Sequence, residues 1–170
     1  MEESISVVAL GPRDWQDLRA IRLEALQSEP AAYSSSYQET LSRSDEHWQQ
    51  RLTNDHSVHL LARALGRPIG MVGGYLGSDE GDDSVAVVFG MYVTSEYRGR
   101  GIGRLLLTTL IDRLSAFPQI STIRLWVTET QVPARALYES MGFRVVGKTE
   151  EGIVVNDRRY EELIMELRVR

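Results

Sequence analysis

The sequence predicts a mixed α/β fold in which a central sheet of about six to seven strands is flanked by about four helices. The first fifty residues carry apolar side chains at helical spacing, whereas residues 58–93 carry short apolar runs separated by glycine and proline. Beyond residue 100, two helical stripes alternate with further apolar runs. The 170 residues, 42% hydrophobic and 25% charged, can bury one core, and no linker or repeat interrupts them. We therefore expect residues 1–170 to form a single domain.

The N-terminal third is expected to hold one short strand and two helices. Residues 7–10 suit a strand, and Pro12 fits the first position of a helix, where its missing N–H costs nothing. This helix should end before Pro30, and residues 30–43 are predicted to be a loop. Ser44 is a suitable cap for a second helix that contains Trp48. The apolar face of the first helix consists of Trp15, Leu18, Ile21, Ala25 and Leu26.

The middle of the chain is predicted to form three strands. Residues 58–65 and 69–76 flank Gly66-Arg67-Pro68, which is typical of a hairpin. Residues 85–93 are nearly all apolar, so we expect a central strand that is buried on both faces. Gly90 inside this strand indicates a bulge or a close backbone approach.

The C-terminal part continues the alternation of helices and strands. A helix is expected from about Gly103 to near Pro118, followed by a strand at residues 123–127. Pro133 should open a short helix that Gly142 ends in a left-handed conformation. The last two strands are expected at residues 143–148 and 161–167.

The charge balance and the missing residue types exclude several classes of protein. A net charge of −5 argues against nucleic acid as a partner, because phosphate binding needs a basic surface. No cysteine is present, which excludes disulfides and thiolate sites and favours the cytoplasm, and the three histidines show no metal spacing, so we expect no metal. No run approaches the ~20 apolar residues of a membrane span, so we expect no membrane association. One loop is strongly acidic, at Asp79, Glu80, Asp82 and Asp83.

The strongest local signal is the segment at residues 97–104, which lies between the buried strand and an amphipathic helix. Its three glycines let the backbone bring N–H groups against a ligand, and the start of the helix adds unpaired N–H groups and the positive end of the dipole. Three arginines add charge of the kind that phosphates need: Arg98, Arg100 and Arg104. The segment therefore predicts a ligand that carries phosphate.

Two familiar nucleotide motifs do not fit this segment. A dinucleotide fingerprint needs Gly-x-Gly-x-x-Gly, but Gly99 and Gly101 are followed by Gly103 and then by Arg104, where the third glycine belongs. A P-loop needs Gly-Lys-Ser/Thr, which is absent.

Two motifs in this order resemble the GNAT superfamily of N-acetyltransferases. Arg98, Gly101 and Gly103 match the Gln/Arg-x-x-Gly-x-Gly/Ala of its pyrophosphate loop, and residues 134–143 match its Ala-x-x-Leu-Tyr-x-x-x-Gly-Phe. The resemblance implies a mostly antiparallel sheet whose central strands, near 85–93 and 123–128, splay apart around acetyl-CoA. It also implies transfer of the acetyl group to a primary amine of a small molecule or an amino-acid-like acceptor, by direct attack on the thioester.

The resemblance assigns roles to particular residues. Tyr138 occupies the position of the general acid, although spacing alone makes it a core residue of its helix. The backbone of Met91 and Val93 would pair with the pantetheine arm, and Gln131 stands where relatives often have asparagine. The residues implied for binding acetyl-CoA are Met91, Tyr92, Val93, Arg98, Gly99, Arg100, Gly101, Ile102, Gly103, Arg104, Gln131 and Ala134.

The acceptor and the base are less well defined by the sequence. Many relatives carry a carboxylate in the central strand, but residues 84–92 contain none, so Glu96, Glu129, Asp83 or a chain of waters remain as alternatives. The acidic loop is a candidate for attracting a cationic acceptor. The candidate residues for binding the acceptor are Tyr33, Ser34, Ser35 and Tyr37.

Alternatives to this activity also remain. They are a non-catalytic acyl-CoA sensor, a protein N-terminal or lysine acetyltransferase, and a dinucleotide-dependent oxidoreductase that Arg104 disfavours. A homodimer is common in the family and is one expected assembly.

Overall fold

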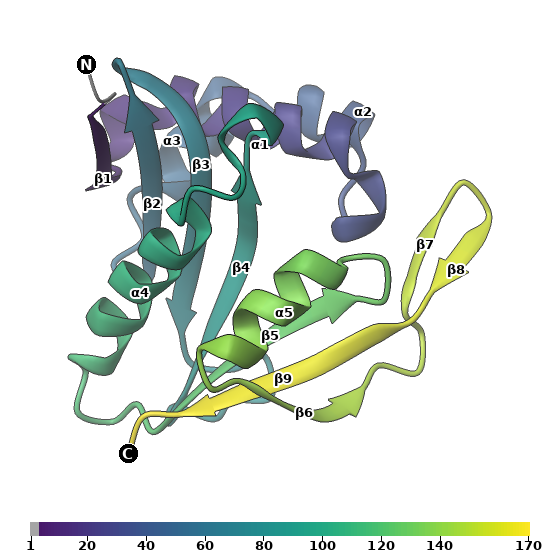
Figure 1. Ribbon diagram of the computed structural model, residues 1–170. Helices are drawn as coiled ribbons and strands as arrows, with labels where there is room; N and C mark the ends of the chain where they lie inside the picture. The colour runs from purple at the N-terminus through teal and green to yellow at the C-terminus, as the bar shows by residue number, and fades with distance from the viewer. Residues whose placement is uncertain (1–3) are drawn as a thin grey trace.

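The computed structural model describes residues 4–170, and its centre is one seven-stranded sheet (Figure 1). The strand order is β1-β2-β3-β4-β5-β9-β6, and every neighbouring pair is antiparallel except β4 and β5, which are parallel. The mostly antiparallel mixed sheet that the sequence predicts is therefore confirmed. The strands are β1 (Ile5–Ala9), β2 (Ser57–Ala64), β3 (Arg67–Leu76), β4 (Val85–Val93), β5 (Thr122–Thr128), β6 (Arg144–Lys148) and β9 (Glu162–Arg168).

Helices cover both faces of the sheet. On one face α4 packs on β2 and β3, and on the other face α1 and α3 pack on the same strands (Figure 1). Each face of the sheet carries its own hydrophobic core, and successive residues of a strand point into the two cores alternately. Leu60, for example, lies in the core under α4, and Leu61 lies in the core under α1 and α3. The helices are α1 (Trp15–Ser28), α2 (Tyr37–Leu41), α3 (Asp45–Arg51), α4 (Ile102–Ser115) and α5 (Val132–Ser140), with short 3₁₀ turns at Pro12–Asp14, Pro30–Ala32 and Ser95–Tyr97.

The two central strands separate along their length, as predicted. β4 and β5 pair only from Val85 opposite Thr122 to Val87 opposite Arg124, and beyond this point they diverge (Figure 1). Helix α5 lies over β5 on the far side of the opening. The divergence leaves the second half of β4 without a strand partner on its β5 side.

Gly90 forms the predicted bulge in β4. Phe89 pairs with Gly73 and Tyr92 pairs with Met71, so two residues of β4 oppose a single residue of β3. Gly90 has a φ of +66°, which a residue with a Cβ adopts at a cost. The bulge turns the following residues of β4 into the opening between the strands.

One prediction about the connecting segments was wrong, and one element was not predicted. Residues 30–43 are not simply a loop, because they contain α2, whose start is capped by the Ser36 Oγ that accepts a hydrogen bond from the Glu39 N–H at 3.1 Å. Between β6 and β9 the chain also forms a hairpin of β7 (Ile153–Val155) and β8 (Arg158–Tyr160). Its turn residues, Asn156 and Asp157, both have positive φ, as a two-residue hairpin turn requires.

Among the helices of residues 4–170, none combines the length and the apolar character needed to cross a lipid bilayer.

Candidate active site

The glycine-rich loop leads directly into helix α4 and leaves an open cradle of backbone. Gly99 and Gly101 have φ of +73° and +79°, and Gly101 is the N-cap of the helix. A Cβ at either position would meet no atom within 4 Å, so both glycines face open space. The first hydrogen bond from this loop into the helix runs from the Leu105 N–H to the Gly101 carbonyl at 3.0 Å, which leaves the preceding N–H groups directed outwards. This arrangement suits a bound phosphate.

The third glycine of the loop has a different role, which is close packing. A Cβ on Gly103 would lie 3.3 Å from Leu137 Cδ2, so the first turn of α4 lies directly against α5. Arg104 strengthens this contact, because its Nη2 donates a hydrogen bond to Ser140 Oγ at 2.7 Å. The two motifs of the sequence are therefore adjacent in the fold.

The side chain of Arg98 is engaged by the protein itself. Its Nε donates to the Val93 carbonyl at 2.8 Å, and its Nη2 lies 3.2 Å from Glu29 Oε1 at the end of α1. Its guanidinium carbon also lies 5.6 Å from the centre of the Tyr92 ring. Arg98 thus ties the loop to β4 and α1, so the backbone N–H groups are the main donors left to a phosphate.

A cavity of about 530 Å³ lies between the loop, the end of β4 and the start of α5. Every residue that the sequence assigns to cofactor binding lines this cavity except Arg100, which lies over the Tyr97 ring at 5.0 Å. Residues that line the cavity without having been predicted are Glu29, Tyr97, Thr130, Pro133 and Leu137.

A smaller cavity of about 70 Å³ occupies the opening between β4 and β5. Met91, Gln131 and Ala134 line both cavities, so the two adjoin each other. Tyr138 and Tyr33 line the smaller cavity but not the larger one. The smaller cavity, which we call the splay cavity, therefore lies next to the larger one at the place where the strands part.

The edge of β4 offers the splay cavity fewer free carbonyls than the sequence suggests. The Thr94 N–H bonds to the Ile69 carbonyl at 2.9 Å on the β3 side, so Val93 and Met91, one and three residues earlier, direct their backbone groups to the cavity. The Met91 carbonyl accepts a hydrogen bond from the Tyr33 hydroxyl at 3.0 Å, and the Val93 carbonyl accepts one from Arg98. The N–H groups of Met91 and Val93 are consequently the donors that face the cavity.

Tyr138 presents a protonated phenol to the splay cavity. Its side chain is 5% exposed, and its ring centre lies 6.0 Å from that of Phe143. Burial, and to a smaller extent the nearby carboxylate of Glu29, raise the pKa of Tyr138 well above its usual range. The phenol therefore keeps its proton at neutral pH and is available as a hydrogen-bond donor.

The candidates for the acceptor site and the base are only partly brought to these cavities. Of the four predicted acceptor residues, Tyr33 lines the splay cavity, whereas Ser34, Ser35 and Tyr37 line neither cavity. Asp83, Glu96 and Glu129 line neither. The acidic loop lies before β4, about 26 Å of strand away from Met91, at the end where β4 and β5 still pair. Its carboxylates contact the protein itself, since Asp82 accepts a hydrogen bond from Ser84 Oγ at 2.6 Å.

At the site, a parallel strand pair that separates lies next to a glycine-rich anion cradle. The chain belongs to the GNAT acetyltransferase family, because residues 15–143 match the model of the Acetyltransferase (GNAT) family.

Individual relatives agree with this assignment. The L-amino acid N-acetyltransferase AaaT of Escherichia coli K12 is 26% identical over 146 residues, which cover 84% of this chain and 86% of AaaT. The N-acetylaspartate synthetase of Xenopus tropicalis is 34% identical over 105 residues, which cover 61% of this chain but only 37% of that protein. The structure of yncA from Salmonella typhimurium with its cofactor acetyl-CoA has the same fold, with a TM-score of 0.81, 17% identity and coverage of 98% and 95% of the two chains.

Proposed function

We propose that this protein transfers the acetyl group of acetyl-CoA to a primary amine of a small molecule or an amino-acid-like acceptor. The observation that carries the proposal is the pair of adjoining cavities, with the anion cradle lining the larger one and Tyr138 lining the smaller one. The family to which the chain belongs and the acetyl-CoA bound to yncA support the choice of donor. The name of AaaT, which acts on L-amino acids, supports the class of acceptor.

The residues fit acetyl-CoA in charge, donors and space. The N–H groups from Gly99 to Arg104 would hold the pyrophosphate, and those of Met91 and Val93 would hold the amide-bearing pantetheine arm. A cavity of about 530 Å³ lies within the range of ~300–1,000 Å³ that is usual for small-molecule sites. Gln131 and Ala134, which line both cavities, would lie beside the arm where it passes into the splay cavity.

Acetyl-CoA supplies the acetyl group as a thioester, from which an amine displaces a thiol. Tyr138 would donate a hydrogen bond to the sulfur as negative charge develops there. Full proton transfer from the phenol is uphill by more than about 2 kcal/mol, since an unperturbed phenol has a pKa near ~10, a thiol near ~8.5, and burial raises the former. Tyr138 therefore acts by hydrogen bonding rather than as a strong acid.

The amine must lose a proton before it attacks. Among residues 4–170, the side chains that line the splay cavity include no carboxylate and no imidazole. Keeping a lysine-like amine neutral at pH 7 costs about 4.6 kcal/mol, and this cost falls by about 1.4 kcal/mol for each pH unit. We infer that the amine reacts from its neutral fraction, so that kcat/KM rises nearly tenfold per pH unit up to the pKa of the amine.

The same lack of a carboxylate or imidazole favours a second candidate function, a non-catalytic acyl-CoA sensor. Release of thiol from acetyl-CoA, measured with a panel of amines, separates the two. We expect release that depends on the amine and yields one acetylated amine per thiol. Tight binding of acetyl-CoA without release above the hydrolytic background, for every amine at pH 7 to 9, would favour the sensor.

We further propose that residues 1–170 work as one acetyltransferase domain in the cytoplasm. The chain has no cysteine, so it needs no oxidising compartment for the formation of disulfides. Limited proteolysis should leave the region from β1 to β9 as one resistant fragment, and a stable smaller fragment would contradict this.

A further inference from the structure

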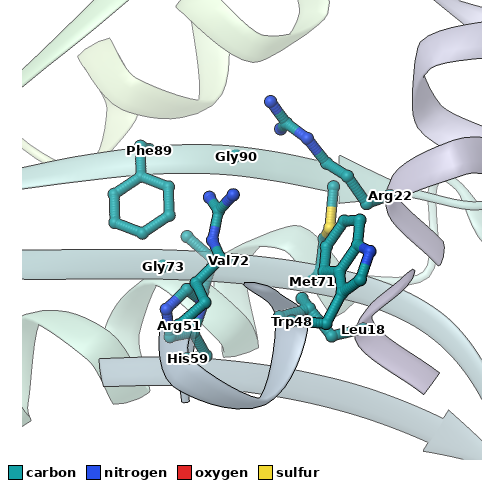
Figure 2. Close-up of a pocket in the computed structure, with 10 residues that line it drawn as sticks. All are labelled: Leu18, Arg22, Trp48, Arg51, His59, Met71, Val72, Gly73, Phe89 and Gly90. Atoms are coloured by element: carbon teal, nitrogen blue, oxygen red, sulfur yellow. The ribbon is translucent and has the colours of Figure 1, made fainter. Parts of the chain in front are cut away.

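Two arginines lie on the face of the sheet that carries α1 and α3, beside the bulge in β4. Arg22 comes from α1 and Arg51 is the last residue of α3 (Figure 2). Both side chains are partly buried, and Figure 2 shows the guanidinium of Arg51 close to β4 beside Gly90, whereas the side chain of Arg22 extends across β4. A Cβ on Gly90 would lie 3.4 Å from Arg22 Nη1, so the guanidinium of Arg22 touches the bulge itself.

Neither guanidinium has a counter-ion among residues 4–170. In the part of the chain that the structure describes, no carboxylate lies within 4.0 Å of Arg22 or Arg51, although other arginines make such pairs. Aromatic rings flank them instead: the guanidinium carbon of Arg22 lies 4.6 Å from the centre of the Tyr33 ring, and that of Arg51 lies 5.6 Å from the Phe89 ring. Two partly desolvated cations therefore share one hollow.

The electrostatics of this hollow favour an anion. Burial lowers the pKa of Arg22, and burial together with the positive charges of Arg22 and Arg43 lowers the pKa of Arg51 to about 10. His59, beside them, is held neutral by burial and by the charge of Arg51, which lower its pKa to about 4. Each positive charge thus adds to the free-energy cost of burying the other, and a bound anion would offset the cost of burying both charges.

This hollow adjoins the splay cavity and is small, at about 10 Å³. Phe89 and Gly90 line both, and Tyr33, against which Arg22 packs, lines the splay cavity and holds the Met91 carbonyl. On its other side, Arg51, His59 and Phe89 also line a further open hollow of about 330 Å³. A molecule whose amine lies in the splay cavity would therefore place another group against the arginines once their side chains move apart to widen this small hollow, and it could extend outwards past Phe89.

We propose that Arg22 and Arg51 bind a carboxylate of the acceptor, so that the protein acetylates amines that carry a carboxylate, as amino acids do. The planar fork of a guanidinium matches the two oxygens of a carboxylate, and two such forks on a desolvated surface select strongly against a neutral group in that place. The assignment rests on the proposed acetyl transfer and narrows its substrate class. It replaces the acidic loop, which lies elsewhere, as the feature that selects the acceptor.

The test compares acceptors that differ only at the carboxylate. We would measure thiol release from acetyl-CoA with a set of amino acids, their carboxamides and their aminophosphonate analogues. The wild-type protein should prefer the best amino acid over its carboxamide by at least tenfold in kcat/KM. Arg22→Met and Arg51→Met keep the apolar stem of the side chain and should reduce the preference to less than threefold, mainly through a higher KM for the amino acid.

Controls separate this assignment from a structural role and from the proposed activity. Arg113→Met removes an exposed arginine of α4 on the other face of the sheet and should leave the preference unchanged. The Kd of acetyl-CoA should stay within twofold in all three variants, and the Tm of Arg22→Met and Arg51→Met should not fall, because each removes an unpaired, partly buried charge. A Tm that falls by more than 5 °C in both variants, with the carboxylate preference retained, would show that the arginines only support the fold.

Two further outcomes overturn the assignment. Equal turnover of amino acids and carboxamides by the wild-type protein would refute carboxylate recognition while leaving acetyl transfer intact. A higher kcat/KM for aminophosphonates would assign the site to a different anion. If no amine of any kind yields thiol, the proposed function itself fails, and this result differs from both of the others.

Discussion

Replacing Tyr138 with phenylalanine tests the chemistry of the splay cavity with the smallest change. The variant loses one hydroxyl and keeps the ring that packs near Phe143. No described residue forms a hydrogen bond with this hydroxyl, so its removal leaves no partner unsatisfied, and the free energy of unfolding should change by less than about 0.5 kcal/mol.

The expected effect is on kcat. A hydrogen bond to a charged group contributes about 1.5–3 kcal/mol, which corresponds to a loss of about 10- to 150-fold in the rate of the chemical step. The raised pKa of Tyr138 argues against the larger losses of about 10⁴-fold that a strong general acid can give. The KM for acetyl-CoA should remain within about threefold, because the phenol lies beyond the cradle that holds the phosphates.

The assay is single-turnover acetyl transfer from acetyl-CoA to a saturating amine, with thermal unfolding recorded in parallel. A single-turnover rate equal to that of the wild-type protein would remove Tyr138 from the mechanism. A fall in Tm that accompanies the loss of rate would instead assign Tyr138 to the core, as its helical spacing alone suggests.

The remaining predictions concern the loop, the core histidine and the cavity carboxylate. Gly101→Ala and Gly66→Ala both place a Cβ at positive φ with open space around it, so each should lower the free energy of unfolding in urea by about 1 kcal/mol. Only Gly101→Ala should weaken the binding of acetyl-CoA, by at least tenfold in calorimetry. Equal affinities in the two variants would show that the cradle does not bind the donor. The pKa of His59 in the folded protein is lowered to about 4 from 6.5. As the pH falls from 6.5 to 4, the unfolded chain therefore takes up the proton before the folded protein does, and the protein loses stability, by roughly 3 kcal/mol at pH 4. In urea unfolding, the free energy of unfolding of His59→Gln should fall less between pH 6.5 and pH 4 than that of the wild-type protein. The same dependence on pH in both proteins would contradict the burial of a neutral imidazole. Glu29→Gln removes the ion-pair partner of Arg98, which lies at 3.2 Å. Because this pair is partly exposed, the binding of acetyl-CoA should weaken by no more than about fivefold. A loss of all activity with binding retained would instead identify Glu29 as the missing base.

The strongly periodic elements of the fold could be predicted from the sequence, and the short ones could not. The strand at Val85–Val93 and the helix at Ile102–Ser115 carry long apolar patterns that favour these structures. Helix α2 has only five residues, too few for a helical stripe to be recognised. The β7–β8 hairpin has three residues in each strand and an Asn-Asp turn without glycine, which is a weak signal.

The candidate site also has one part that could be predicted from the sequence and one part that could not. The cradle and Tyr138 belong to continuous motifs, so one pass along the chain finds them. Arg22 and Arg51 come together only through packing of α1 and α3 on the bulge in β4, and no motif joins them. A signal was nevertheless present: Arg22 follows Leu18 by four residues and Arg51 follows Trp48 by three, so each places a charge next to a buried position of an apolar helical face.

The assignment of the acetyl-CoA site is tested most directly by residue-resolved amide hydrogen exchange of the protein with and without acetyl-CoA. We expect slower exchange on binding at the amides of Gly99 to Arg104, which form the cradle, and at those of Met91 and Val93, which face the splay cavity. The amides of the β7–β8 hairpin should be unaffected. Binding of acetyl-CoA that leaves the exchange of the loop and of β4 unchanged, or that protects a different surface, would contradict the assignment of the site.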